Sequence, residues 1–181
     1  MRRTAAWAVA TLLAAAPTVA RAQHVGTWTE LPAPSSSTVG ATVATGLAVS
    51  GGPHTYKVGV DYDYTLTGPL LLALHGAAAL AGDGVGLHLA PGVRYLLPQE
   101  GLPWIPYGRA ALAVDILGAN VETDAGFGIG VKLGAGLQYH FVKDLAVGPE
   151  LTLTYGALAG DGGSRSALAA DVLIALSHRL P

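Results

Sequence analysis

The residues that could do chemistry in this chain of 181 residues are charged and histidine side chains placed at every second position of apolar stretches. Lys132 is an example, since it lies in "FGIGVKLGAGLQYHF" (residues 127–141), where every odd position is apolar and the even positions are mostly glycine. The charged residues that share this placement are Lys57, Asp61, Asp63, Arg94, Arg109, Asp115, Lys132, Glu150, Asp171 and Arg179. Their five bases balance their five acids, which predicts a network of buried ion pairs.

Two histidines raise the question of a metal site. His75 and His88 lie on the polar side of two consecutive apolar stretches, and Asp61 is a conceivable third ligand. Two histidines without a closely spaced motif are weak evidence for a metal, so histidines that are hydrogen-bonded to neighbouring side chains are the favoured interpretation. We expect neither a metal nor a cofactor.

A nucleophile and base for catalysis are not evident. Ser177 and His178 are adjacent, but neighbours in a strand point to opposite faces and cannot form such a pair. The glycines of "GFGIG" (residues 126–130) do not form a dinucleotide-binding motif, because no helix follows them. We therefore expect no catalytic residue.

The elements that position these residues are strands. From Val39 onward the pattern has a period of two, broken by short turns that imply eight antiparallel strands in a meander. The turns lie at residues 50–53, 67–69, 81–84, 98–103, 118–124, 142–144 and 159–165. The sequence thus predicts an all-β protein.

The two faces of these strands differ in character. One face carries no Asp, Glu, Lys or Arg and is rich in large aliphatic side chains, whereas the other carries the charges among Gly, Ala and Thr. An eight-stranded barrel could not enclose so much aliphatic area, but a surface that faces lipid requires it. We predict an eight-stranded antiparallel up-and-down transmembrane β-barrel with a polar interior filled by side chains. Pro91, Pro106 and Pro149 fall on the lipid-facing side, where we expect β-bulges to accommodate them.

Aromatic residues cluster by depth along the predicted strands. If the N-terminus is periplasmic, one group lies near the periplasmic rim and predicts an aromatic girdle, with a sparser second group (Tyr56, Phe127 and Tyr155) toward the other rim. The girdle consists of Tyr62, Tyr64, Tyr95, Trp104, Tyr139 and Phe141.

The first residues read as a targeting segment. Arg2 and Arg3, an apolar run and "ARA" at 20–22 are typical of a secretory signal peptide over residues 1–22. We expect a flexible lead-in over residues 23–38 and the barrel over residues 39–181. Loss of Arg2, Arg3 and Arg21 would leave seven basic residues against 12 acidic ones, a formal charge of −5 that disfavours nucleic acid as a partner. The chain has no cysteine, so burial and strand pairing must stabilise it.

Together the export signal, the short alternating strands, the aromatic girdles and the lack of cysteine resemble the small eight-stranded outer-membrane barrels of the OmpA/OmpX type, over residues 39–180. The chain departs from that type in ending on Pro181 instead of an aromatic residue. The resemblance implies a monomer in the bacterial outer membrane, with membrane lipids and the barrel-assembly machinery as partners. A structural or interaction role is the favoured function, with a narrow channel for small solutes or ions as the alternative and a lipid-modifying enzyme third.

Overall fold

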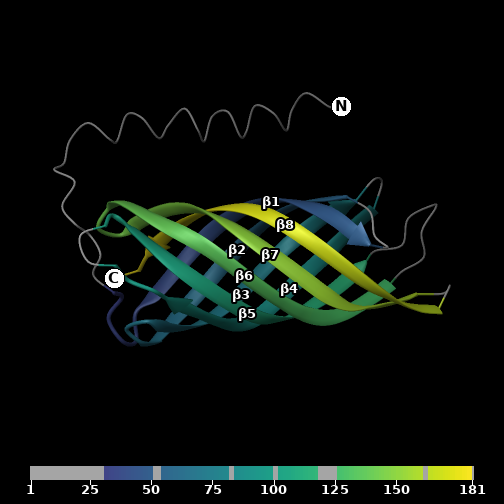
Figure 1. The fold of residues 1–181 in the computed structure, drawn as a ribbon, viewed down its shortest axis with the longest axis horizontal. Helices are drawn as coiled ribbons and strands as arrows, with labels where there is room; N and C mark the ends of the chain where they lie inside the picture. Colours follow the sequence, from purple (N-terminus) through teal and green to yellow (C-terminus); the bar gives the residue numbers. More distant parts are fainter. Residues whose placement is uncertain are drawn as a thin grey trace, which may run out of the picture.

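A closed barrel of eight strands makes up the computed structural model, which describes residues 31–50, 54–81, 84–99, 102–117, 126–160 and 163–180 (Figure 1). The strands are β1 Ser37–Ser50, β2 Thr55–Thr67, β3 Leu70–Ala81, β4 Gly84–Leu96, β5 Trp104–Leu117, β6 Gly126–Val142, β7 Leu145–Gly160 and β8 Gly163–Arg179. Each pairs antiparallel with its neighbour in sequence, and β1 pairs with β8. The predicted all-β meander is confirmed. The predicted signal peptide and Pro181 lie outside the described residues.

No helix among the described residues is long and apolar enough to cross a membrane.

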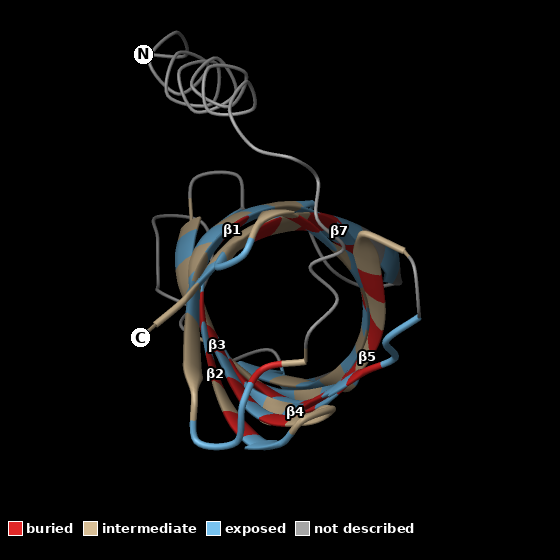
Figure 2. Cartoon of the chain, turned by 90° about the vertical axis from the view of Figure 1, so that its left-hand side faces the viewer, coloured by how far each residue is buried: buried red, intermediate tan, exposed pale blue. Residues whose placement is uncertain are grey.

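The barrel presents its apolar side chains outward. Val131 is 51% exposed, whereas Lys132, the next residue of β6, is 0% exposed and points into the lumen. Figure 2 shows this alternation of exposed and buried residues along the strands. The large apolar residues that the structure exposes come from every strand. The predicted assignment of faces therefore agrees with the exposure of these residues.

The two ends of the barrel differ. At the end where β1 begins and β8 ends, here called the termini end, the links are the short turns after β2 and β6 and residues 97–103 (Figure 1, left). At the other end the hairpin of β7 and β8 projects past its neighbours (Figure 1, right). These two strands have 16 and 17 residues, more than the 9 to 11 or so that span a bilayer core.

The three prolines are accommodated without bulges, so that expectation is wrong. The register shifts lie elsewhere, at Ala48/Ser50, Thr65/Thr67 and His140/Val142. At Pro91 the ladder between β4 and β5 pauses after Leu89↔Val114 and resumes in the same register at Gly92↔Ala111. Pro149 interrupts the pairing of β7 with β6 in the same way. An inserted residue would shift neighbouring side chains to the wrong face, and Glu150 next to Pro149 must keep facing the lumen.

The described residues before β1 are hydrogen-bonded to the termini end, and the flexibility expected of residues 23–38 stays a prediction. Ser35 N–H donates to Thr65 O at 2.9 Å, and Thr65 N–H donates to Ser36 O at 2.9 Å. Leu31 packs against buried apolar residues of the barrel interior. In the structure β1 begins at Ser37, two residues before the predicted start of the barrel.

Candidate functional site

Two arginines and three carboxylates form the half of the lumen nearer the termini end. Arg94 Nη1 donates to Asp63 Oδ2 at 2.6 Å, and Arg109 Nη2 donates to Asp61 Oδ1 at 2.8 Å. Glu150 lies between the arginines, with Oε2 3.9 Å from Arg94 Nη2 and Oε1 3.6 Å from Arg109 Nη1. All five side chains are buried, so these charges pair out of contact with bulk water, and the cluster carries one more acid than base.

Two lysines and an aspartate continue the network toward the other end. Lys57 Nζ donates to both carboxylate oxygens of Asp171, at 2.9 and 2.8 Å. Lys132 Nζ lies 4.0 Å from Asp171 Oδ2 and 3.4 Å from His88 Nε2. Thr152 Oγ1 donates to Asp171 Oδ2 at 3.4 Å. Because Asp171 holds Lys57 closely, it does not depend on Lys132 for its charge partner.

The two histidines connect these halves. His75 Nδ1 lies 3.1 Å from Asp61 Oδ1, and His88 Nδ1 lies 2.7 Å from Asp115 Oδ1. The two rings meet edge to face, with centroids 5.6 Å apart. No three His, Cys, Asp or Glu side chains within the described ranges converge as metal ligands. Each imidazole is instead oriented by the carboxylate of a neighbouring strand, the hydrogen-bonded arrangement that the sequence favours.

Tyr107 is a lumen residue that sequence reasoning missed. Its hydroxyl donates to Glu150 Oε2 at 2.7 Å, and its ring centroid lies 4.6 Å from Arg94 Cζ, within cation–π range. The available signal was parity: Trp104 and the even residues after it in β5 face outward, so the odd-numbered Tyr107 must face inward. Inward-facing Leu71, Leu96 and Ile105 were also missed, and they pack with Tyr107 as an apolar cluster.

Glycines on the inner face make room for the larger side chains. A Cβ on Gly136 would come within 2.5 Å of the Tyr107 hydroxyl, and one on Gly46 would come within 2.6 Å of Asp171 Oδ1. On Gly134 it would lie 3.0 Å from Glu150 Oε1. The alternation of glycine with aliphatic residues in β6 is therefore the counterpart of the charged side chains on other strands.

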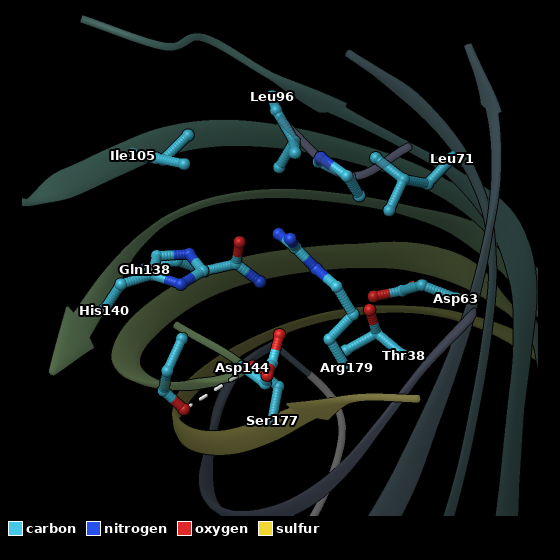
Figure 3. A pocket seen from close by; sticks show the side chains of 12 residues that line it. Thr38, Asp63, Leu71, Leu96, Ile105, Gln138, His140, Asp144, Ser177 and Arg179 are labelled. Atoms are coloured by element: carbon cyan, nitrogen blue, oxygen red, sulfur yellow. Dashed lines mark hydrogen bonds between the residues drawn. The ribbon is translucent and has the colours of Figure 1, made fainter. Parts of the chain in front are cut away.

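A polar crevice opens at the termini end of the lumen (Figure 3). It consists of two adjoining cavities that share Thr38, Asp63, Gln138 and Ser177 as lining. The outer cavity is lined also by Pro32, Leu71, Leu96, Ile105, His140, Asp144, Ala146 and Arg179, and the inner one by Gly40, Asp61, Arg94, Tyr107, Leu137, Gly148 and Ala175. Arg179 extends into the outer cavity from β8 (Figure 3). The crevice thus connects this mouth with the arginine–carboxylate part of the network.

Ser177 and His178 lie on opposite sides of the barrel wall. Ser177 lines the crevice and its hydroxyl donates to Ala146 O at 3.5 Å, whereas His178 is exposed on the outside. The alternation along β8 keeps the two side chains apart, as expected.

The residues assigned to the aromatic girdle belong to the outward-facing set of β2, β4, β5 and β6. Tyr62, Tyr95 and Tyr139 are exposed, and Tyr64, Trp104 and Phe141 are partly exposed. Trp104 and Tyr139 face each other across β5 and β6 near the termini end. The Tyr62 hydroxyl lies 2.9 Å from Ser37 Oγ, at the start of β1. These side chains thus lie on the outside near one end of the barrel, on four of its eight strands.

No protein-family model matches the chain, and no curated protein matches it in sequence. Its structure is similar to the N-terminal β-barrel domain of Pseudomonas aeruginosa OprF, with 20% identity, a TM-score of 0.61, and coverage of 81% of this chain and 99% of that chain. Neisserial surface protein A matches with 12% identity, a TM-score of 0.63, and coverage of 80% and 96%.

The outer membrane protein OprG from Pseudomonas aeruginosa matches with 10% identity, a TM-score of 0.52, and coverage of 84% and 98%. At this level of identity the likeness shows the fold, and the fold is that of the small eight-stranded outer-membrane barrels, as predicted.

Proposed function

We propose that this chain is a small, non-catalytic barrel of the bacterial outer membrane, which serves a structural or interaction role with its lumen closed by its own side chains. The observation that carries the proposal is the ion network inside the barrel. It extends from Asp63 to Asp171, and Lys132 and Asp171 within it are 0% exposed. Eight strands leave room for side chains but not for a wide aqueous pore.

The outer surface supports the membrane part of the proposal. Large aliphatic residues cover the outside, and aromatic residues of β2, β4, β5 and β6 lie near its termini end, where membrane and water would meet. Membrane lipids are then the immediate partners, the barrel-assembly machinery acts during insertion, and the barrel functions as a monomer. Residues 1–22 would direct export and be removed.

The proposal that the barrel is not an enzyme rests on where its candidate catalytic side chains lie. Ser177 and His178 are separated by the barrel wall, and the Asp115–His88 pair leads to Lys132, which has no exposed surface. A substrate could not reach that lysine without displacing the network. Comparison of the lipids of cells with and without the protein tests this part, because a lipid-modifying enzyme would change them.

Membrane fractionation, gel mobility and conductance together test the proposal. A folded barrel should partition with outer membranes and should migrate differently before and after heating in detergent. In planar bilayers the folded protein should show little or no steady current, since the network blocks the lumen. A protein that stays in the soluble fraction and does not shift on heating would contradict the membrane assignment.

A narrow channel is the second candidate, and the crevice at the termini end favours it. The crevice reaches from this mouth of the barrel to Asp61 and Arg94 and would form the first part of a path through the lumen. Large, stable, ohmic conductance of the wild-type protein would place the channel above the closed barrel.

A further inference from the structure

The chain reverses direction just before it enters the barrel wall. Leu31 and Pro32 lie inside the mouth at the termini end, and β1 begins in the wall at Ser37. Between them Ser35 has a φ of 65°, a left-handed conformation that is uncommon for residues other than glycine. Seen from this end, the chain before β1 turns back into the ring of strands (Figure 2). The reversal at Ser35 therefore directs Leu31 and Pro32 into the lumen.

Leu31 packs against the apolar part of an otherwise polar barrel interior. Leu71, Leu96, Ile105 and Tyr107, from β3, β4 and β5, form a buried cluster, and Leu31 packs against it. Ile105 is only 1% exposed. Without Leu31, this cluster would face the mouth, where apolar side chains meeting water are unfavourable.

The hydrogen bonds that attach residues 31–36 to β2 lie at the C-terminal side of these residues. The backbone bonds to Thr65 come from Ser35 and Ser36, and the Ser36 hydroxyl donates to Ala33 O at 2.6 Å. The contacts of Leu31 and Pro32 with the interior are apolar or with the walls of the crevice. A rotation at Ser35 that carried these two residues out of the mouth would break the bond from Ser35 N–H to Thr65 O and the bonds that Ala33 O accepts from Ser36. Ser36 would stay attached to β2 through the bond from Thr65 N–H to Ser36 O.

We propose that residues 31–36 form a stopper that pivots at Ser35 and controls access from solution to the apolar cluster and the crevice at the termini end. In the closed state Leu31 covers the cluster and Pro32 borders the crevice that leads to Asp61 and Arg94. The proposal goes beyond the proposed function and does not depend on whether the lumen conducts.

A disulfide tests the closed position. An ideal Cβ placed on Gly68, in the turn after β2, would lie 3.6 Å from Leu31 Cβ, within the range of disulfides. The chain has no cysteine of its own, so Leu31→Cys with Gly68→Cys should form one intramolecular disulfide on mild oxidation of folded protein in detergent. Leu31→Cys with Gly108→Cys is the matched control, because Gly108 faces outward with nothing within 4 Å of its Cβ position. Equal cross-linking of the two pairs, or none at Gly68, would overturn the closed position.

Thiol labelling tests the pivot. Ile105→Cys in the otherwise unchanged folded protein should react slowly with a small charged thiol reagent, because the stopper covers it. Adding Ser35→Val, which places a β-branched residue at positive φ, should raise that rate at least tenfold, since the closed turn is strained for valine. Adding Ser35→Gly instead should leave the rate slow, because glycine adopts this φ readily.

A second cysteine separates opening of the stopper from general loosening. Leu173→Cys, buried to 1% exposure in β8 beside Glu150, should react equally slowly in all three backgrounds. The proposal is overturned if Ser35→Val leaves the rate at Ile105→Cys unchanged. It is also overturned if the rates at Ile105→Cys and Leu173→Cys rise together, since the barrel itself would then be opening.

Discussion

Arg94 and Arg109 stand directly opposite each other on β4 and β5, although like charges on facing strands repel. Each guanidinium has its own carboxylate, Asp63 for Arg94 and Asp61 for Arg109, and Glu150 from β7 lies between the two. The cross-strand pair is therefore stable only as part of a five-residue cluster, in which Glu150 is the carboxylate that lies within 4 Å of both guanidinium groups.

Glu150→Ala should destabilise the folded barrel by about 3 to 5 kcal/mol, because it removes the carboxylate that approaches both buried guanidinium groups and leaves the lumen as a whole with one uncompensated positive charge. It should also admit water to the lumen, so that brief openings become more frequent in planar bilayers. Denaturant unfolding and single-channel recording measure the two effects.

Addition of Arg109→Met to Glu150→Ala should recover part of the stability and reduce the openings, because it restores the balance of charge over the lumen as a whole. The coupling in this double-mutant cycle measures the interaction of the two residues. Strict additivity of the two substitutions would contradict the cluster. Asp144→Ala, at the exposed turn after β6, is a control that removes a carboxylate outside the network.

Tyr107 makes two contacts that substitutions can separate. Tyr107→Phe removes the hydrogen bond to Glu150 and should cost about 1 to 3 kcal/mol, while the ring stays beside Arg94. Tyr107→Leu removes the ring as well and should cost roughly 0.5 to 2 kcal/mol more. Equal unfolding free energies for the two variants would show that the ring contributes nothing to holding Arg94.

Two neighbouring residues of β6 should differ in how much a change of charge destabilises the barrel. Val131→Arg places a charge on the outer surface near the middle of the strand and should cost about 2 to 4 kcal/mol in lipid. Lys132→Met should cost about 1 kcal/mol or less, since Asp171 keeps Lys57 as its close partner. Folding yield and unfolding free energy in lipid vesicles provide the comparison. If Val131→Arg folds as well as the wild type in vesicles, the outer face is not in lipid.

Replacement of glycine by alanine should destabilise the barrel more on its inner face than on its outer face. Gly136→Ala should cost about 1 to 3 kcal/mol, because its methyl group would meet the Tyr107 ring and a backbone oxygen of Pro149. Gly108→Ala should have little effect, because the Cβ position there is open. Thermal unfolding of both variants tests this difference, and equal melting temperatures would contradict the role of Gly136 as space for Tyr107.

The sequence was sufficient to predict the fold, because in a closed transmembrane barrel apolar and polar residues alternate along every strand, and this pattern resumes after each turn. The parity that placed Val131 outside and Lys132 inside is local information, present in each strand by itself. Ion-pair partners are not local: Lys57 and Asp171 lie far apart in the chain and meet because β1 lies between β2 and β8. The predicted set of charged residues could therefore be identified by face, but not divided into pairs.

Two features of the structure could not be predicted for a different reason. Proline lacks a donor, and a bulge is one way to accommodate it, but the pattern around Pro149 does not reveal that Glu150 must keep its direction. Residues 31–36 contain proline and serine and read as a flexible segment, whereas the apolar cluster that receives Leu31 forms from three strands. Both outcomes depend on contacts made only after the barrel has closed.

The ladder between β1 and β8 joins the first strand to the last, from Thr38↔Arg179 to Ser50↔Leu168. Until the barrel closes, β1 therefore has only β2 as a partner, and its other edge is unpaired and could join a strand of another chain. Contacts so distant in sequence are also slow to form. Survival of chains that have not yet closed thus depends on how long this edge is shielded, and a delay in pairing β8 with β1 should increase aggregation without altering the stability of the finished barrel.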